Sequence, residues 1–309
     1  MNSNKKFFSN IGFNYMIFGI LALIFQIILV NILNITDPNL ITDFNIMTIL
    51  VALCNYLLPF PIFIYLMKKI PTYELESEKP GLLRFVKYIA ITLTLMWLGN
   101  LFGLAITALL GVAMNAEISN PVTELINSSN ILLNLFLISI IGPIFEEIIF
   151  RKILIDRTIK YGAKVSIIIS AVIFGFIHGN LNQFFYAFLI GGFFAYVYIK
   201  TGSIKYSIIL HIITNIMGSI VSIFIVSSAD AITHGSFTAF DLVGVAIYLI
   251  IVLGSLFIGI FSLTTYNTAR FNGRKTKIAL KNPIKTILLN PGMILFMLFY
   301  IFEILYQIL

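Results

Sequence analysis

Long apolar runs constrain this fold more than any other feature of the sequence. Nine stretches of the 309-residue chain carry few charges, and most reach the roughly 20 residues that a helix needs to cross the hydrocarbon core of a bilayer. They cover residues 13–33, 46–66, 82–110, 131–150, 165–178, 184–199, 206–226, 242–263 and 287–309. With 59% hydrophobic and 11% charged residues, the chain has too little polar surface to cover a soluble domain. The sequence therefore predicts an all-α fold, a polytopic transmembrane helix bundle of about eight or nine spans.

Neither a separate soluble domain nor an internal repeat is visible in the sequence. We therefore expect residues 1–309 to form a single integral membrane domain, with residues 131–226 as its core helices. The first apolar run has no small-residue cleavage site after it, so we expect it to be a retained anchor. Cys54 is the single cysteine and lies in an apolar run, which excludes a disulfide framework and a cysteine metal site.

The distribution of positive charge predicts an orientation. When the loops are assigned alternately to two sides, all 20 Lys and Arg residues fall on one side and the other loops have none. The positive-inside rule then predicts a cytoplasmic N-terminus and, with nine spans, an outward C-terminus. The net charge of +7 thus reflects topology and indicates no nucleic-acid partner. The abundance of Ile, Asn and Lys hints at an AT-rich bacterial source, so the expected location is a bacterial plasma membrane.

Two adjacent carboxylates, Glu146 and Glu147, interrupt the fourth apolar run. A charge near the bilayer centre costs roughly 2.5–3.5 kcal/mol on insertion scales, so such residues usually face the interior of a bundle. Glu147 and Arg151 are four residues apart and can pair on one helical face. Glu146 lies about 100° around the helix and is left available. Pro143 removes one backbone hydrogen bond and is expected to kink the helix just before the carboxylates.

Two later runs also carry polar residues in apolar surroundings: His178, and then His211 with Asn215 four residues further on. Together with Glu146 they suit two kinds of site. Glu146, His178 and His211 supply enough ligands for a divalent metal such as zinc with an open water position. Alternatively, Glu146 and His178 activate water while His211 and Asn215 donate hydrogen bonds to an oxyanion. Either site implies hydrolysis of an amide within the membrane.

These motifs resemble those of the CAAX protease and bacteriocin-processing family, the Abi or Rce1-like group of intramembrane endopeptidases. Glu-Glu-x-x-x-Arg at 146–151, Phe-x-x-x-His at 174–178 and His-x-x-x-Asn at 211–215 match in the family's order, over residues 131–226. The resemblance implies an active site, open to the cytosolic side, formed by Glu146, His178, His211 and Asn215, and supported by Glu147, Arg151 and Phe174. It also implies a glutamic-type or metallo-type peptidase whose substrate is a membrane-associated peptide or protein.

Other interpretations stay open at this stage. The polar residues can also serve a non-catalytic immunity or sensor scaffold, or a proton-coupled carrier. Many carriers consist of two related halves, and this sequence shows no such internal symmetry. We expect water activation without a tightly bound metal, because Glu147 is already paired and leaves no further carboxylate to orient the histidines. Since a bacterium is not expected to prenylate CAAX proteins, a membrane-bound peptide precursor is the favoured substrate. The sequence does not fix the oligomeric state.

The depth of the site raises one difficulty. Glu146 and His211 lie five or six residues from basic residues, which corresponds to about 8 Å along an ideal helix. His178 lies fourteen residues beyond Lys164, which corresponds to about 21 Å. A tilted helix, a basic segment that dips into the bundle, or a later helix start would reconcile the two depths.

Overall fold

The computed structural model describes residues 2–115, 118, 121–265 and 278–308, and every regular element in these ranges is helical. The α-helices are α1 (Ser3–Thr36), α2 (Phe44–Ala52), α3 (Phe60–Met67), α4 (Leu82–Met114), α5 (Pro121–Ser128), α6 (Ile131–Leu133), α7 (Gly142–Glu147), α8 (Leu154–Thr158), α9 (Ala163–Ile177), α10 (Leu181–Thr201), α11 (Ile204–Ile216), α12 (Ser222–Thr233), α13 (Ala239–Thr265), α14 (Pro283–Ile287) and α15 (Pro291–Ile308). The remaining segments are the 3₁₀ turns η1 (Pro38–Thr42) and η5 (Ile159–Tyr161) and the π-helical segments η2 (Leu53–Leu57), η3 (Asn134–Ile141), η4 (Ile148–Ile153) and η6 (Met217–Val221).

Eight helical stretches in the described ranges are long and apolar enough to cross a membrane. The other predicted run forms α9, which has 15 residues and is shorter than a full span. Three of the eight stretches combine several elements; the fourth run, for example, continues through η4 and α8 to Tyr161. The prediction of an all-α polytopic bundle is therefore confirmed.

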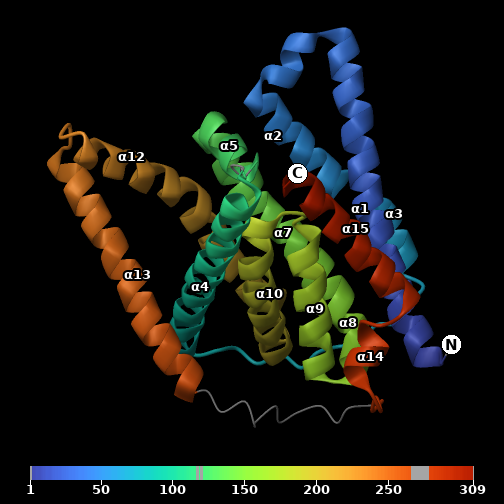
Figure 1. Cartoon of the computed structure of the whole chain (residues 1–309). Coiled ribbons are helices and arrows are strands. Elements are labelled where there is room, and N and C mark those ends of the chain that lie inside the picture. Colours follow the sequence, from blue (N-terminus) through green and yellow to red (C-terminus); the bar gives the residue numbers. More distant parts are fainter. Residues whose placement is uncertain (1, 116–117, 119–120, 266–277, 309) are drawn as a thin grey trace.

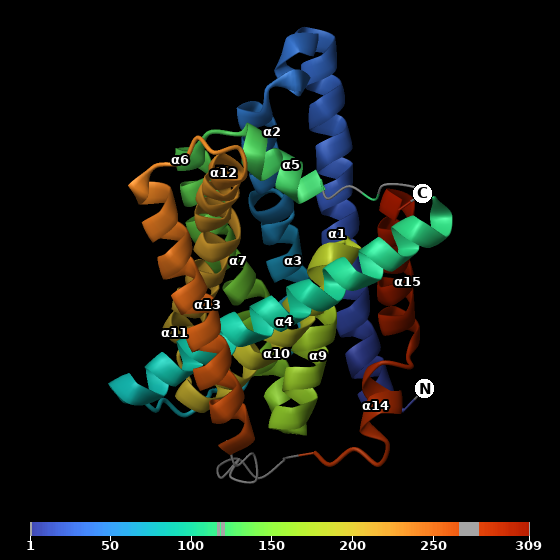
Figure 2. The same cartoon turned by 60° about the vertical axis from the view of Figure 1, so that its left-hand side comes forward.

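The short helix α9 lies beside α10 in the middle of the bundle, and longer helices surround the pair (Figure 1). Helix α15 runs along α1 on one side, while α12 and α13 form a hairpin that leans away on the other. Helix α4 is strongly inclined and crosses the bundle against α10 (Figure 2). Two glycines of α4 permit this approach: a Cβ atom at Gly99 would collide with the backbone of Tyr186, and one at Gly103 would lie 2.8 Å from Asn182 O. The small-residue spacing in the third run thus marks a helix contact.

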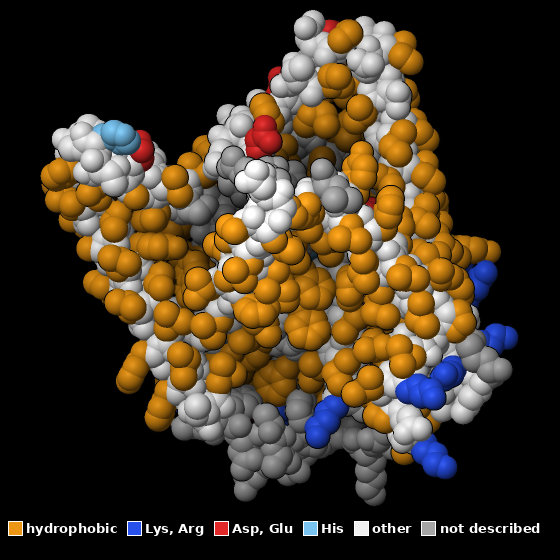
Figure 3. Space-filling view, in the orientation of Figure 1, with side chains coloured by type: hydrophobic (Ala, Val, Ile, Leu, Met, Phe, Trp, Pro, Cys, Tyr) orange, Lys and Arg blue, Asp and Glu red, His pale blue; other side chains and the backbone are white. Residues whose placement is uncertain are grey.

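Charge is distributed unequally between the two ends of the molecule. The Lys and Arg side chains visible in Figure 3 gather at its lower end, where Figure 1 places the N-terminus and α14. The acidic and histidine side chains visible in the same view lie in its upper half. This arrangement agrees with the separation of charge that the loops predict.

Arg151 is an exception to that separation, because it is fully buried inside the bundle. The next residue, Lys152, has 57% of its side-chain surface exposed and lies six residues from Glu146, and Lys205 lies six residues from His211. The burial of Arg151 therefore does not remove the difference in depth that the spacing indicates between Glu146 and His178.

Candidate active site

The two adjacent carboxylates have different surroundings. Glu147 Oε1 lies 3.2 Å from Arg151 Nη2, and both side chains are fully buried. The guanidinium of Arg151 also lies 4.4 Å from the ring centroid of Phe174, a cation–π contact in a desolvated setting. The Glu146 side chain is 14% exposed, and within the described part of the chain it forms no ion pair with Arg151. The structure therefore contains the pair that the four-residue spacing predicts, and Glu146 is outside it.

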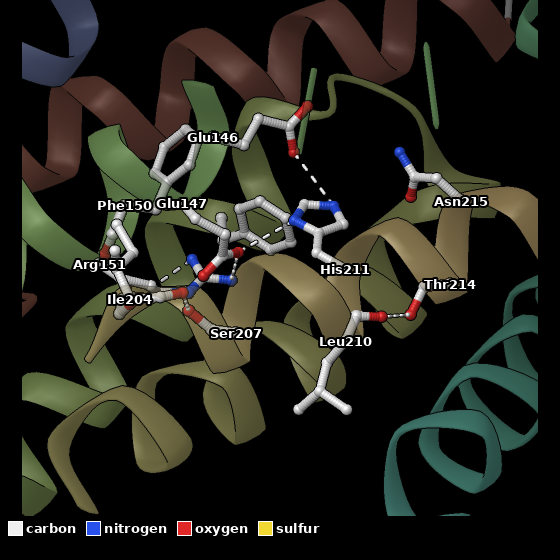
Figure 4. A network of polar contacts seen from close by, with 12 residues as sticks. Glu146, Glu147, Phe150, Arg151, Ile204, Ser207, Leu210, His211, Thr214 and Asn215 are labelled. Carbon is white, nitrogen blue, oxygen red and sulfur yellow. Dashed lines mark hydrogen bonds and ion pairs between the residues drawn. The ribbon is translucent and has the colours of Figure 1, made fainter. Parts of the chain in front are cut away.

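His211 lies between the two carboxylates and is almost completely buried, with 2% of its surface exposed. Its Nδ1 lies 2.9 Å from Glu147 Oε1, and its Nε2 lies 3.5 Å from Glu146 Oε2 (Figure 4). An ionised Glu147 accepts the Nδ1 hydrogen and so fixes the orientation of the ring. Glu147 therefore contacts both Arg151 and His211, a double role that helical spacing did not reveal.

His178 is held by a bond to the backbone of its own helix. It is partly exposed just after α9, and its Nδ1 lies 2.7 Å from the carbonyl oxygen of Phe174. A hydrogen on Nδ1 leaves Nε2 of the neutral ring as an acceptor. The Phe174 ring contacts both imidazoles, with centroid distances of 4.8 Å to His178 and 5.6 Å to His211. Phe174 thus separates and orients the two histidines, and no hydrogen bond or ion pair joins His178 to Glu146 within the described part of the chain.

Asn215 lies one turn after His211 on α11 and reaches across to the bent fourth span. Its Nδ2 donates to the carbonyl oxygen of Ile138 at 2.9 Å. The neighbouring Gly142 N–H bonds to the carbonyl of Leu137, five residues back. In that π-helical pattern the donor for Ile138 would be residue 143, but Pro143 has no N–H. The proline therefore leaves a carbonyl free for Asn215, and the second N–H of the amide remains available.

Sequence reasoning missed Tyr56. This residue comes from η2 in the second span, and its hydroxyl donates to Glu146 Oε1 at 2.5 Å. Within the described residues, the other oxygen, Oε2, is buried and accepts no hydrogen bond. A tyrosine in an apolar run is common in this chain, which has 14, so no feature of the sequence distinguishes Tyr56 from the others.

The candidate metal ligands do not converge on a common point. No group of three or more His, Cys, Asp or Glu side chains in the described part of the chain is placed to hold a metal ion. Each histidine is bonded through Nδ1, His211 to Glu147 Oε1 and His178 to the carbonyl oxygen of Phe174, which is how ligating histidines are usually held. Glu147 thus orients a histidine although it is paired with Arg151, contrary to the expectation from the sequence. As arranged, the described residues nevertheless assemble no three-ligand zinc site.

The arrangement provides two hydrogen-bond acceptors beside the polar groups of α11. Glu146 offers Oε2, which accepts no hydrogen bond from the described chain and lies 3.5 Å from His211 Nε2, and His178 offers an Nε2 acceptor. His211 Nε2 and the second N–H of Asn215 lie on α11, one turn apart. Such a set can hold and deprotonate a water molecule and can stabilise an oxyanion.

A comparison with protein-family models matches the same region. The family model described as "Type II CAAX prenyl endopeptidase Rce1-like" matches residues 128–217. A curated protein of Bacillus subtilis (strain 168), "Putative membrane peptidase YdiL", is 34% identical over 109 residues, which cover 34% of this chain and 43% of that protein. The match thus spans less than half of the relative's length. No solved structure gives a significant match to the chain.

Proposed function

From the premise that this chain belongs, through residues 128–217, to the Rce1-like family of CAAX protease and bacteriocin-processing proteins, we propose that it is an intramembrane endopeptidase. It hydrolyses a peptide bond of a membrane-associated peptide or protein. The observation that carries the proposal is the contrast between the neighbouring carboxylates: Glu147 is completely buried and paired with Arg151, whereas Glu146 is 14% exposed and lies outside that pair, 3.5 Å from His211 Nε2. Glu146 is therefore the carboxylate that a water molecule and a substrate can reach.

Glu146 acts as the general base in the proposed reaction. A water molecule is held between Glu146 Oε2 and His178 Nε2, and its proton passes to Glu146 as its oxygen attacks the scissile carbonyl carbon. The C–N bond of the resulting tetrahedral intermediate then breaks. The proton on Glu146 moves to the departing amine, so the carboxylate is regenerated at the end of the turnover.

His211 and Asn215 stabilise the oxyanion of that intermediate. With a hydrogen on Nδ1 bonded to Glu147, His211 must be an imidazolium for Nε2 also to donate. Asn215 supplies its second N–H, since the first is bonded to Ile138. Donors fixed in advance in a site with little water stabilise developing charge most effectively.

The proposed enzyme lies in a bacterial plasma membrane with its N-terminus and the basic end of the bundle in the cytoplasm. Asn39 and Lys79 are exposed near opposite ends and test this orientation. In a Cys54→Ala background, an impermeant thiol reagent added to intact cells should label Asn39→Cys but not Lys79→Cys. The reverse pattern would overturn the orientation without affecting the proposed chemistry.

Proteolysis can be tested before any substrate is identified. Membranes from cells that produce the wild type, Glu146→Gln or the exposed control Glu124→Gln are compared by mass spectrometry of protein N-termini. We expect a set of new N-termini in membrane proteins or peptides with the wild type and the control but not with Glu146→Gln. Identical N-termini in all three samples would favour the non-catalytic scaffold or the carrier.

A further inference from the structure

Tyr56 reaches the carboxylate from outside the segment that the family model matches. Its hydroxyl donates to Glu146 Oε1 at 2.5 Å, which is the short distance typical of a hydroxyl donating to an ionised carboxylate. The aromatic ring is partly buried and stacks on Phe145, with centroids 5.9 Å apart and an interplanar angle of 24°. The second span of the chain, which contains Tyr56, is thus hydrogen-bonded directly to the candidate general base.

The bond determines which oxygen of Glu146 remains available. Glu146 has several rotatable bonds, and His211 Nε2 is already 3.5 Å from its Oε2. Without a donor on Oε1, the carboxylate is free to turn and close a direct bond to His211. With Tyr56 in place, Oε1 is occupied, and Oε2 accepts no hydrogen bond from the described chain.

Gly142 makes room for the phenol. It lies one turn before Glu146 on the same helical face. A Cβ atom at Gly142 would lie 3.2 Å from the Tyr56 hydroxyl oxygen and 3.3 Å from the carbonyl oxygen of Leu137. Both distances are tighter than ordinary van der Waals contact, so a side chain at position 142 would displace the hydroxyl, the Leu137 carbonyl or both.

We propose that Tyr56, seated against Gly142, is a positioning residue that holds Glu146 with one oxygen turned toward the reacting water. This role rests on the proposed endopeptidase activity. A hydrogen bond to a charged group contributes enough that its loss should lower kcat roughly 10- to 100-fold. KM should stay nearly constant, because Tyr56 acts on the base and not on substrate binding.

The kinetic test uses full-length protein in proteoliposomes and a peptide that spans a cleavage site identified from the new N-termini. Tyr56→Phe should lower kcat and leave KM and the melting temperature nearly unchanged. The control Tyr65→Phe removes a hydroxyl from an exposed position in the same span and should behave as the wild type. Gly142→Ala should lower kcat similarly, and Tyr56→Phe/Gly142→Ala should be no slower than the slower single variant. Additive losses, or full activity of Tyr56→Phe, would overturn the inference.

A second measurement does not depend on activity. The melting temperatures of Tyr56→Phe, Glu146→Gln and the double variant form a thermodynamic cycle, and a direct bond predicts non-additive shifts. Additive shifts would contradict the bond itself. Proteolysis that persists in Glu146→Gln would instead refute the proposed function, so the two failures are distinguishable.

Discussion

The two sides of the His211 ring differ in how far their side chains are exposed. On the Nδ1 side, Glu147 bonds to both His211 and Arg151, and all three residues are buried. On the Nε2 side, Glu146 and Asn215 are partly exposed. Both sides contain a buried carboxylate oxygen that accepts no hydrogen bond from the described chain, Glu147 Oε2 and Glu146 Oε2, but the partly exposed side is the one that a ligand can reach. The buried side of the ring therefore holds the site, and the open side is where chemistry is expected.

The largest effect should come from the open side. Glu146→Ala removes the carboxylate that is placed to deprotonate the water, so cleavage of the identified peptide should fall below detection. The variant should still insert and fold, because Glu146 is outside the buried ion pair. Rate and melting temperature, measured on the same preparation, check both parts. Residual cleavage near the wild-type rate would assign the base to another residue.

Removing Glu147 should instead damage stability. Glu147→Ala leaves Arg151 charged and fully buried without its partner and also releases His211 Nδ1. Breaking a buried ion pair from one side costs about 3–5 kcal/mol, so we expect lower expression and a lower melting temperature. Glu147→Ala/Arg151→Met removes both charges and serves as the matched control. A double variant no more stable than Glu147→Ala would show that the unpaired charge is not the cause.

Asn215→Ala tests the proposed oxyanion donor on the Nε2 side of the His211 ring. Loss of one preorganised donor commonly lowers kcat by about 10²–10³-fold, and we expect that range with little change in melting temperature. Steady-state kinetics on the peptide provide the measurement. A rise in KM at constant kcat would instead place Asn215 in substrate binding.

Pro143→Ala should have the smallest effect. The restored N–H at position 143 competes with Asn215 for the carbonyls before it, so the amide is held less firmly. A net hydrogen bond of about 1 kcal/mol corresponds to a loss in kcat of roughly fivefold. Pro143→Ala combined with Asn215→Ala should be no slower than Asn215→Ala alone. A further loss in the double variant would show that the proline acts elsewhere.

Much of the fold followed from local sequence. The lengths of the apolar runs located the spans. The four-residue spacing of Glu147 and Arg151 predicted the ion pair that the structure contains. Both depend on the length and period of a single helix, which sequence records directly. The roles of Glu146, His178, His211 and Asn215 in catalysis stay predictions.

Contacts between distant segments could not be predicted in this way. The bond from Tyr56 to Glu146 joins residues 90 positions apart, and the bond from Asn215 to Ile138 joins residues 77 positions apart. Each depends on how two spans are rotated and tilted against each other, which side-chain packing decides.

The central claim is that Glu146 and His178 activate water without a tightly bound metal. Elemental analysis of purified active protein tests it most directly when the cleavage rate is also followed through chelation and metal add-back. We predict substoichiometric zinc and a rate that chelation leaves unchanged. One zinc per chain, with activity lost on chelation and restored by zinc, would contradict the account.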